Sequence, residues 1–80
     1  MQITFKKDIN NADNFVKLCS AYKEDIDLFA GGKYIVNAKS LLGVASCAGY
    51  DDLEVDIKTS DSKLADGFYD AVRRAGFAKK

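Results

Sequence analysis

The chain has 80 residues, 48% of them hydrophobic and 30% charged, and we expect a single globular domain over residues 1–80. Twelve basic and twelve acidic residues cancel to a net charge of zero, so no overall field attracts nucleic acid or an anionic membrane. The longest apolar stretch is too short to span a bilayer, and the N-terminus lacks the apolar region of a signal peptide, which indicates a cytoplasmic protein.

The first half of the chain predicts a strand and a helix, followed by a hairpin. Alternation over residues 2–7 predicts a half-buried strand, and helical spacing predicts a helix over about 11–22, with cap candidates in residues 8–11. Residues 25–30 alternate and predict a strand, Gly31-Gly32 is typical of a hairpin turn, and residues 34–38 form the returning strand of that hairpin. Phe29 falls on the outer side of its strand, where it either covers the bare face of the sheet or contacts a neighbouring molecule.

The second half predicts a short helix, a strand and a longer helix. Ser40 occupies the N-cap position of a helix over 41–47, and Gly49 is a natural C-terminal stop. Residues 53–58 alternate between apolar and charged, and a polar turn with Ser60 or Asp61 as cap leads into a helix over about 62–75. The order β-α-β-β-α-β-α predicts an α+β domain with helices covering one face of a single sheet.

The predicted core combines inward strand residues with the apolar faces of the helices. It comprises Ile3, Phe5, Ile26, Leu28, Val36, Leu53, Val55 and Ile57 from the sheet, and Phe15, Cys19, Leu64, Phe68 and Val72 from the helices. Cys19 and Cys47 lie far apart in apolar-periodic segments, without a CxxC pair and without any histidine, which favours buried inert thiols over a zinc or redox site. No nucleophile–base pair or metal-ligand set is visible, so we expect no stand-alone catalysis, metal or cofactor.

One segment resembles a known family. The run Asn37-Ala38-Lys39-Ser40-Leu41-Leu42-Gly43-Val44 is similar to the strand end, regulatory serine and short second helix of Gram-positive HPr proteins, the phosphocarriers of the sugar phosphotransferase system. Similarity at the level of pattern extends over about residues 12–75. The resemblance implies an HPr-like open-faced β-sandwich, with a four-stranded antiparallel sheet and three helices on one face.

The chain departs from this family where the family carries its chemistry. HPr proteins have a histidine, followed by an arginine and a proline, in the loop between the first strand and the first helix. The matching segment, Lys7-Asp8-Ile9-Asn10-Asn11, is shorter and contains none of these residues. Since an imidazole supplies the neutral nitrogen nucleophile that this transfer needs, we expect no histidine phosphocarrier activity.

The resemblance assigns a role to Ser40 and its neighbours. HPr proteins of this type are phosphorylated at the corresponding serine by a dedicated HPr kinase, and the product docks on a catabolite-control repressor. Partner binding would then fall to Lys39, Leu41, Leu42, Gly43 and Val44. From the residues alone, Ser40 is a helix cap and Val44 can equally be core, but so short a helix cannot bury every side, so Leu41 or Leu42 should be exposed.

Three hypotheses follow, and none of them involves nucleic acid or a membrane. The favoured one is a bacterial HPr-like regulatory or adaptor protein in sugar transport regulation, acting through Ser40 and the Leu41–Leu42 surface. A second is a phosphocarrier that uses a carboxylate acceptor, Asp8 or Asp13, in place of histidine. A third is a structural or oligomerisation module in which Ser40 is only a cap.

Overall fold

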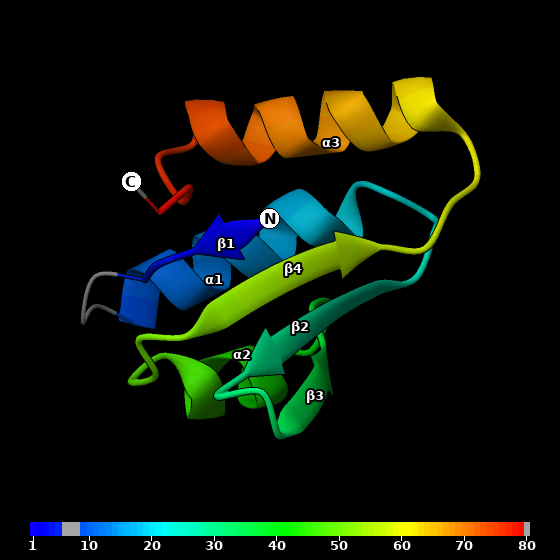
Figure 1. The fold of residues 1–80 in the computed structure, drawn as a ribbon. Coiled ribbons are helices and arrows are strands. Elements are labelled where there is room, and N and C mark those ends of the chain that lie inside the picture. The colour runs from blue at the N-terminus through cyan, green and yellow to red at the C-terminus, as the bar shows by residue number, and fades with distance from the viewer. Residues whose placement is uncertain (6–8, 80) are drawn as a thin grey trace.

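The computed structural model describes residues 1–5 and 9–79, and these form an α+β domain with the predicted element order. The elements are β1 (Gln2–Ile3), α1 (Ile9–Ser20), β2 (Ile26–Ala30), β3 (Tyr34–Asn37), α2 (Leu41–Cys47), β4 (Leu53–Ile57) and α3 (Ser62–Arg74). The three helices lie on one side of the sheet, which leaves its other face open (Figure 1). Within the described ranges, no helix has the length and apolar character needed to cross a membrane.

The sheet has the strand order β1-β4-β2-β3, and every neighbouring pair is antiparallel. The central strands β4 and β2 alternate between buried residues on the helix side and more exposed residues on the open side. Gly31 and Gly32 take positive φ values of 62° and 69° in the β2–β3 turn, as the glycine pair predicted. The open-faced β-sandwich expected from the sequence is therefore confirmed.

The bounds of the first two elements differ most from the sequence prediction. The first strand was expected over residues 2–7, but β1 ends at Ile3, because β4 begins at the opposite residue, Leu53. The amide of Thr4 instead donates to the carbonyl of Phe77 at 2.8 Å. The first helix begins at Ile9 rather than near residue 11, so Asn10 and Asn11 lie in its first turn, while the cap candidate Asp8 falls outside the described residues.

The core is close to the predicted one. Of the expected core residues, Val36 and Leu64 are only half-buried and the others are buried. The structure adds five buried side chains to the predicted core, namely Ala12, Ala30, Ala38, Val44 and Phe77, and Cys47, which was expected to be buried, joins them. Both cysteines are free and buried, as expected, and burial raises the pKa of the Cys19 thiol to about 12 against a small opposing effect of Lys39.

The end of α3 explains why Phe77 joins the core. Gly76 takes a φ of 87°, its amide donates to the carbonyl of Arg73 at 3.0 Å, and the amide of Phe77 donates to the carbonyl of Val72 at 3.2 Å. These two bonds form a Schellman motif, which turns the chain back on the helix and brings the following apolar residue inward. The ring of Phe77 packs edge-on against Phe5 and Phe15, with centroids 5.8 and 5.3 Å away.

Candidate protein-docking site

The segment that resembles the HPr serine region is a hydrogen-bonded turn between β3 and α2. The side-chain Oδ1 of Asn37 accepts from the amide of Lys39 at 2.9 Å, and the carbonyl of Asn37 accepts from the amide of Ser40, also at 2.9 Å. Asparagine favours such turns because its short side chain can replace a backbone acceptor. The turn therefore fixes where α2 begins relative to the edge of the sheet.

Ser40 is the N-cap of α2, as predicted. It has an extended backbone, with φ −98° and ψ 113°, and its Oγ accepts from the amide of Gly43 at 3.3 Å. The bond is at the long end of the usual range, so it constrains the hydroxyl weakly. Ser40 is also exposed, so its hydroxyl is open to a modifying enzyme.

Gly43 and Val44 serve packing rather than the surface. A Cβ on Gly43 would lie 3.2 Å from the Cβ of Val36 and 3.4 Å from the Oγ of Ser40, so the first turn of α2 rests closely on β3. Val44 is completely buried. Its expected place in a partner-binding surface is therefore corrected: the side chain points into the core, because it lies three residues before the buried Cys47 on the same face of α2.

Leu42 and Leu41 are exposed, as the length of the helix predicted. Leu42 is 86% exposed and Leu41 44%, while the neighbouring Lys39 is half-buried. We call Lys39, Ser40, Leu41 and Leu42 the α2 surface. It combines two large apolar side chains with a hydroxyl and a positive charge, a composition suited to a small protein contact.

The other exposed large hydrophobic residues lie in β3 and in the loop after α2. Tyr34 and Ile35 belong to β3 and Tyr50 follows α2, so within the described ranges all five such residues fall in β3, α2 or the loop after it. The rings of Tyr34 and Tyr50 meet edge-on with centroids 5.9 Å apart. Partial removal of water from the Tyr50 hydroxyl raises its pKa, and the nearby hydroxyl of Tyr34 raises it further.

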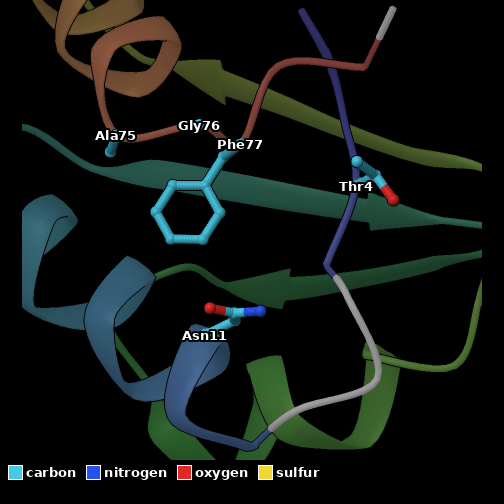
Figure 2. Close-up of a pocket in the computed structure, with 5 residues that line it drawn as sticks. All are labelled: Thr4, Asn11, Ala75, Gly76 and Phe77. Atoms are coloured by element: carbon cyan, nitrogen blue, oxygen red, sulfur yellow. The ribbon is translucent and has the colours of Figure 1, made fainter.

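A hollow lies between the first strand and the end of the last helix, near the start of α1. This pocket of about 150 Å³ is lined by Thr4, Asn11, Ala75, Gly76 and Phe77. In Figure 2 the ring of Phe77 and the amide of Asn11 point toward one another across it, and Thr4 lies to one side. The lining side chains are neutral, and the one hydroxyl among them, that of Thr4, has no general base in the lining to activate it, so the pocket holds no activated nucleophile.

The carboxylate acceptors considered from the sequence lie outside this pocket or outside the described chain. Asp13 is on α1, and its Oδ2 is 3.1 Å from the Nζ of Lys17. The two residues form an i,i+4 ion pair on the helix. Such pairing is the usual arrangement of a solvated helix face. Asp8 falls on residues that the structure does not describe.

The chain resembles a known fold over its whole length. Its structure is similar to the crystal structure of HPr-C-His from Thermoanaerobacter tengcongensis, with a TM-score of 0.69 and 21% identity, covering 100% of this chain and 93% of that one. The chain has the fold of HPr. No protein-family model matches the sequence, and no curated protein matches it. In this fold, residues 37–44 run from the end of β3 into α2.

Sequence reasoning did not single out the exposed side chains of β3. Tyr34 and Ile35 were assigned only to the returning strand of a hairpin. The available signal was the run Tyr34–Asn37, which has no charged residue although it forms an edge of the sheet. Which strand lies at the edge is decided by the strand order, and the periodicity of one segment does not contain that information.

Proposed function

We propose that this HPr-like protein is a regulatory or adaptor protein that docks on other proteins through the α2 surface and is controlled by phosphorylation of Ser40. It acts in a bacterial cytoplasm, in the regulation of sugar transport, and carries no phosphate on histidine. The partners, by resemblance to Gram-positive HPr proteins, are an HPr kinase and a catabolite-control repressor. The single observation that carries the proposal is an 86% exposed Leu42 two residues after an exposed, helix-capping Ser40.

The exposure of Leu42 supports a docking role because leaving a leucine in water is unfavourable. Covering such a side chain stabilises a complex by about 1.5–3 kcal/mol. Leu42 contributes nothing to the core of its own domain, whereas Val44 on the same helix is completely buried. Selection for folding alone therefore gives no reason for a leucine at this position, and a protein contact does.

Ser40 supports control of that contact by a charge. A phosphate on its Oγ would add a charge of about −1.5 to −2 at the positive end of the α2 dipole, beside the side chain of Lys39. The same group would stand directly next to Leu41 and Leu42. A partner with a basic and apolar surface would then bind the phosphorylated form more tightly, and a partner with an acidic surface would bind it more weakly.

Two observations support the absence of carrier chemistry. The sequence contains no histidine, and the pocket at the start of α1 is lined by neutral side chains. The only carboxylate acceptor candidate within the described ranges, Asp13, is paired with Lys17. The carboxylate-carrier hypothesis therefore draws no support from the described part of the chain.

The test is incubation with a Gram-positive HPr kinase and ATP at low protein concentration, followed by intact-protein mass spectrometry. We expect one phosphate on the wild type and none on Ser40→Ala. The kinase should phosphorylate or bind Leu42→Lys at least about tenfold less efficiently than the wild type. This corresponds to a loss of about 1.4 kcal/mol in the free energy of the interaction. The matched control Ile35→Lys replaces another exposed apolar residue by the same charge and should behave as wild type.

Each outcome bears on a separate part of the proposal. A wild-type chain that gains no phosphate would contradict the regulatory role of Ser40 toward this kinase. Equal losses in Leu42→Lys and Ile35→Lys would contradict a specific contact at Leu42. Phosphorylation that persists in Ser40→Ala would place the modified group elsewhere in the chain.

A further inference from the structure

The two edges of the sheet are protected differently. At the β1 edge, the C-terminal segment adds a bridge between Ile3 and Ala78, and the amide of Lys79 donates to the carbonyl of Gln2 at 3.0 Å. At the other edge, no strand from the described ranges pairs with the outer side of β3. Figure 1 shows β3 as the last strand of the sheet, on the side away from β1 and the C-terminus.

The register of the sheet determines which backbone groups of β3 point outward. The amide of Ala38 donates to the carbonyl of Ile26 at 2.9 Å, so the residues of even number in β3 face β2. The bond from Gly31 to Asp52, at 2.8 Å, agrees, because it directs the odd-numbered residues of β2 to β4. The N–H and C=O groups of Ile35 therefore point away from the sheet.

The side chains of this edge are apolar and unguarded. Ile35 is 64% exposed and Tyr34 55%, and the strand contains neither a charged residue nor a proline. Proteins usually protect edge strands from pairing by lysine, proline or a bulge. On the open face, Ile35 lies opposite Phe29 of β2, so two apolar side chains adjoin the free edge.

The edge is complementary to itself. If two copies of β3 pair antiparallel about Ile35, the two isoleucines face each other, Tyr34 faces Val36, and Lys33 faces Asn37, so no like charges meet. The Ile35 amide and carbonyl then satisfy one another reciprocally across a twofold axis. The chain has zero net charge, so there is no overall repulsion between copies.

Neighbouring registers fit less well. A shift that places Ile35 opposite Asn37 requires the carbonyl of Asn37, which already accepts from Ser40 at 2.9 Å. A shift in the other direction requires the amide of Lys33, which already donates to the carbonyl of Ala30 at 3.2 Å. In the register centred on Ile35, the two central bonds use only the outward amide and carbonyl of Ile35, and the engaged groups of Lys33 and Asn37 meet only at the ends of the paired segment.

We propose that this protein forms a symmetric dimer in which the β3 edges of two copies pair antiparallel at Ile35 and join the two sheets into one of eight strands. The proposal goes beyond the function proposed above, since its residues lie in β3 rather than in the α2 surface. The strand is only four residues long, so the interface belongs to the small, weak class, and dimer should accumulate only at high concentration.

The test measures association and pairing on the full chain. Sedimentation equilibrium from about 10 μM to about 1 mM, a span matched to an affinity of ~0.1 mM, should show a dimer fraction that rises with concentration. Amide hydrogen exchange followed by NMR should show slower exchange at Ile35 in the concentrated sample, by about fivefold at about 1 mM, where an affinity of ~0.1 mM leaves about one copy in five free. The exchange rates of amides in α3 should not change with protein concentration.

Two substitutions at the same position separate the side chain from the backbone. Ile35→Lys places two like charges opposite each other and should abolish the dimer. Ile35→Pro removes the outward N–H, which the β2–β3 ladder does not use, and should abolish it as well. The matched control Leu42→Lys has the same change in charge on the α2 surface and should dimerise as the wild type.

Three results would overturn the proposal. A wild type that stays monomeric up to about 1 mM would contradict the dimer. The β3 edge would then be expected to pair with an extended segment of another protein. A dimer that persists in Ile35→Lys, or one that disappears in Leu42→Lys alone, would place the contact elsewhere. Because Ile35→Lys keeps Ser40 and Leu42, phosphorylation of that variant by the kinase reports on the proposed function independently of the dimer.

Discussion

At the β1 edge of the sheet, Phe77 and the residues after it cover the strand, whereas at the β3 edge the apolar side chains of Tyr34 and Ile35 remain in water. The first arrangement places an aromatic residue where it stabilises the fold, in contact with Phe5 and Phe15. The second leaves apolar area that contributes little to folding and is available for binding. Substitutions at the two edges should therefore separate stability from association.

The largest expected effect is at the covered edge. Phe77→Ala should lower the free energy of unfolding by about 3–5 kcal/mol, because it removes a buried ring and the apolar contact of the Schellman motif. Urea denaturation followed by circular dichroism measures the change, with Phe77→Leu as the milder variant if the alanine variant does not fold.

The matched substitution at the open edge is Ile35→Ala, measured below the dimer concentration, and it should change the free energy of unfolding by less than about 0.5 kcal/mol. Equal losses at the two positions would contradict the distinction between the edges.

Two helical glycines test how closely α2 lies on β3. Gly67→Ala in α3 meets no atom within 4 Å and should stabilise the protein by about 1 kcal/mol through helix propensity. Gly43→Ala should gain less or lose stability, because its Cβ would press on Val36. Thermal unfolding of both variants gives the difference, and an equal gain for Gly43→Ala would show that α2 has room to move away from the strand.

The two helix caps should differ in strength. The Oδ1 of Asp61 accepts from the amides of Lys63 and Leu64 at 3.0 and 3.2 Å, while the Oγ of Ser40 accepts one bond at 3.3 Å. Asp61→Ala should therefore cost about 1 kcal/mol and Ser40→Ala about 0.5 kcal/mol in denaturant unfolding. A larger loss in Ser40→Ala would mean that this serine is needed mainly for folding.

The smallest effect is expected on the open face, from the ion pair of Asp56 and Lys58 at 2.9 Å. The hydrogen bond from Lys58 holds the pKa of Asp56 below its usual value of 3.8, so the contribution of the carboxylate is present above that pH and is lost as the pH falls through the lowered value. The same bond raises the pKa of Lys58 above 10.5, so the contribution of the ammonium is lost only as the pH rises through the raised value.

Asp56→Asn should consequently lower the thermal midpoint slightly at neutral pH, and the difference from wild type should vanish in strong acid. A difference that grows on acidification would contradict this assignment of the charge. A large effect at neutral pH would show that the open face contributes more to stability than its apolar edges do.

The sequence predicted the α2 region closely because its signals are local. Ser40 as a cap and the limits of α2 follow from a hydroxyl, a short apolar run and its neighbours, and the structure confirms them. By contrast, the end of β1 depends on where β4 begins, and the place of Phe77 depends on a turn after Gly76 that brings it to a distant ring. A partner far along the chain decides both, and periodicity carries no information about it.

The same distinction explains the docking residues. Exposure of Leu42 could be anticipated, since a seven-residue helix on a sheet has a free side. The resemblance assigned Val44 to the partner-binding surface, but its side chain is buried on the same helix face as Cys47, whose burial the sequence predicted. Local geometry was therefore the better guide at this position.

Intact-protein mass spectrometry of two parallel reactions tests the central claim most directly, namely that this HPr fold has a serine-controlled docking surface and no phosphocarrier site. One reaction contains HPr kinase and ATP, and the other contains enzyme I and phosphoenolpyruvate. We predict the mass of one phosphate in the first reaction, absent from Ser40→Ala, and no added mass in the second. Phosphate gained from phosphoenolpyruvate, with none gained from the kinase, would contradict the account.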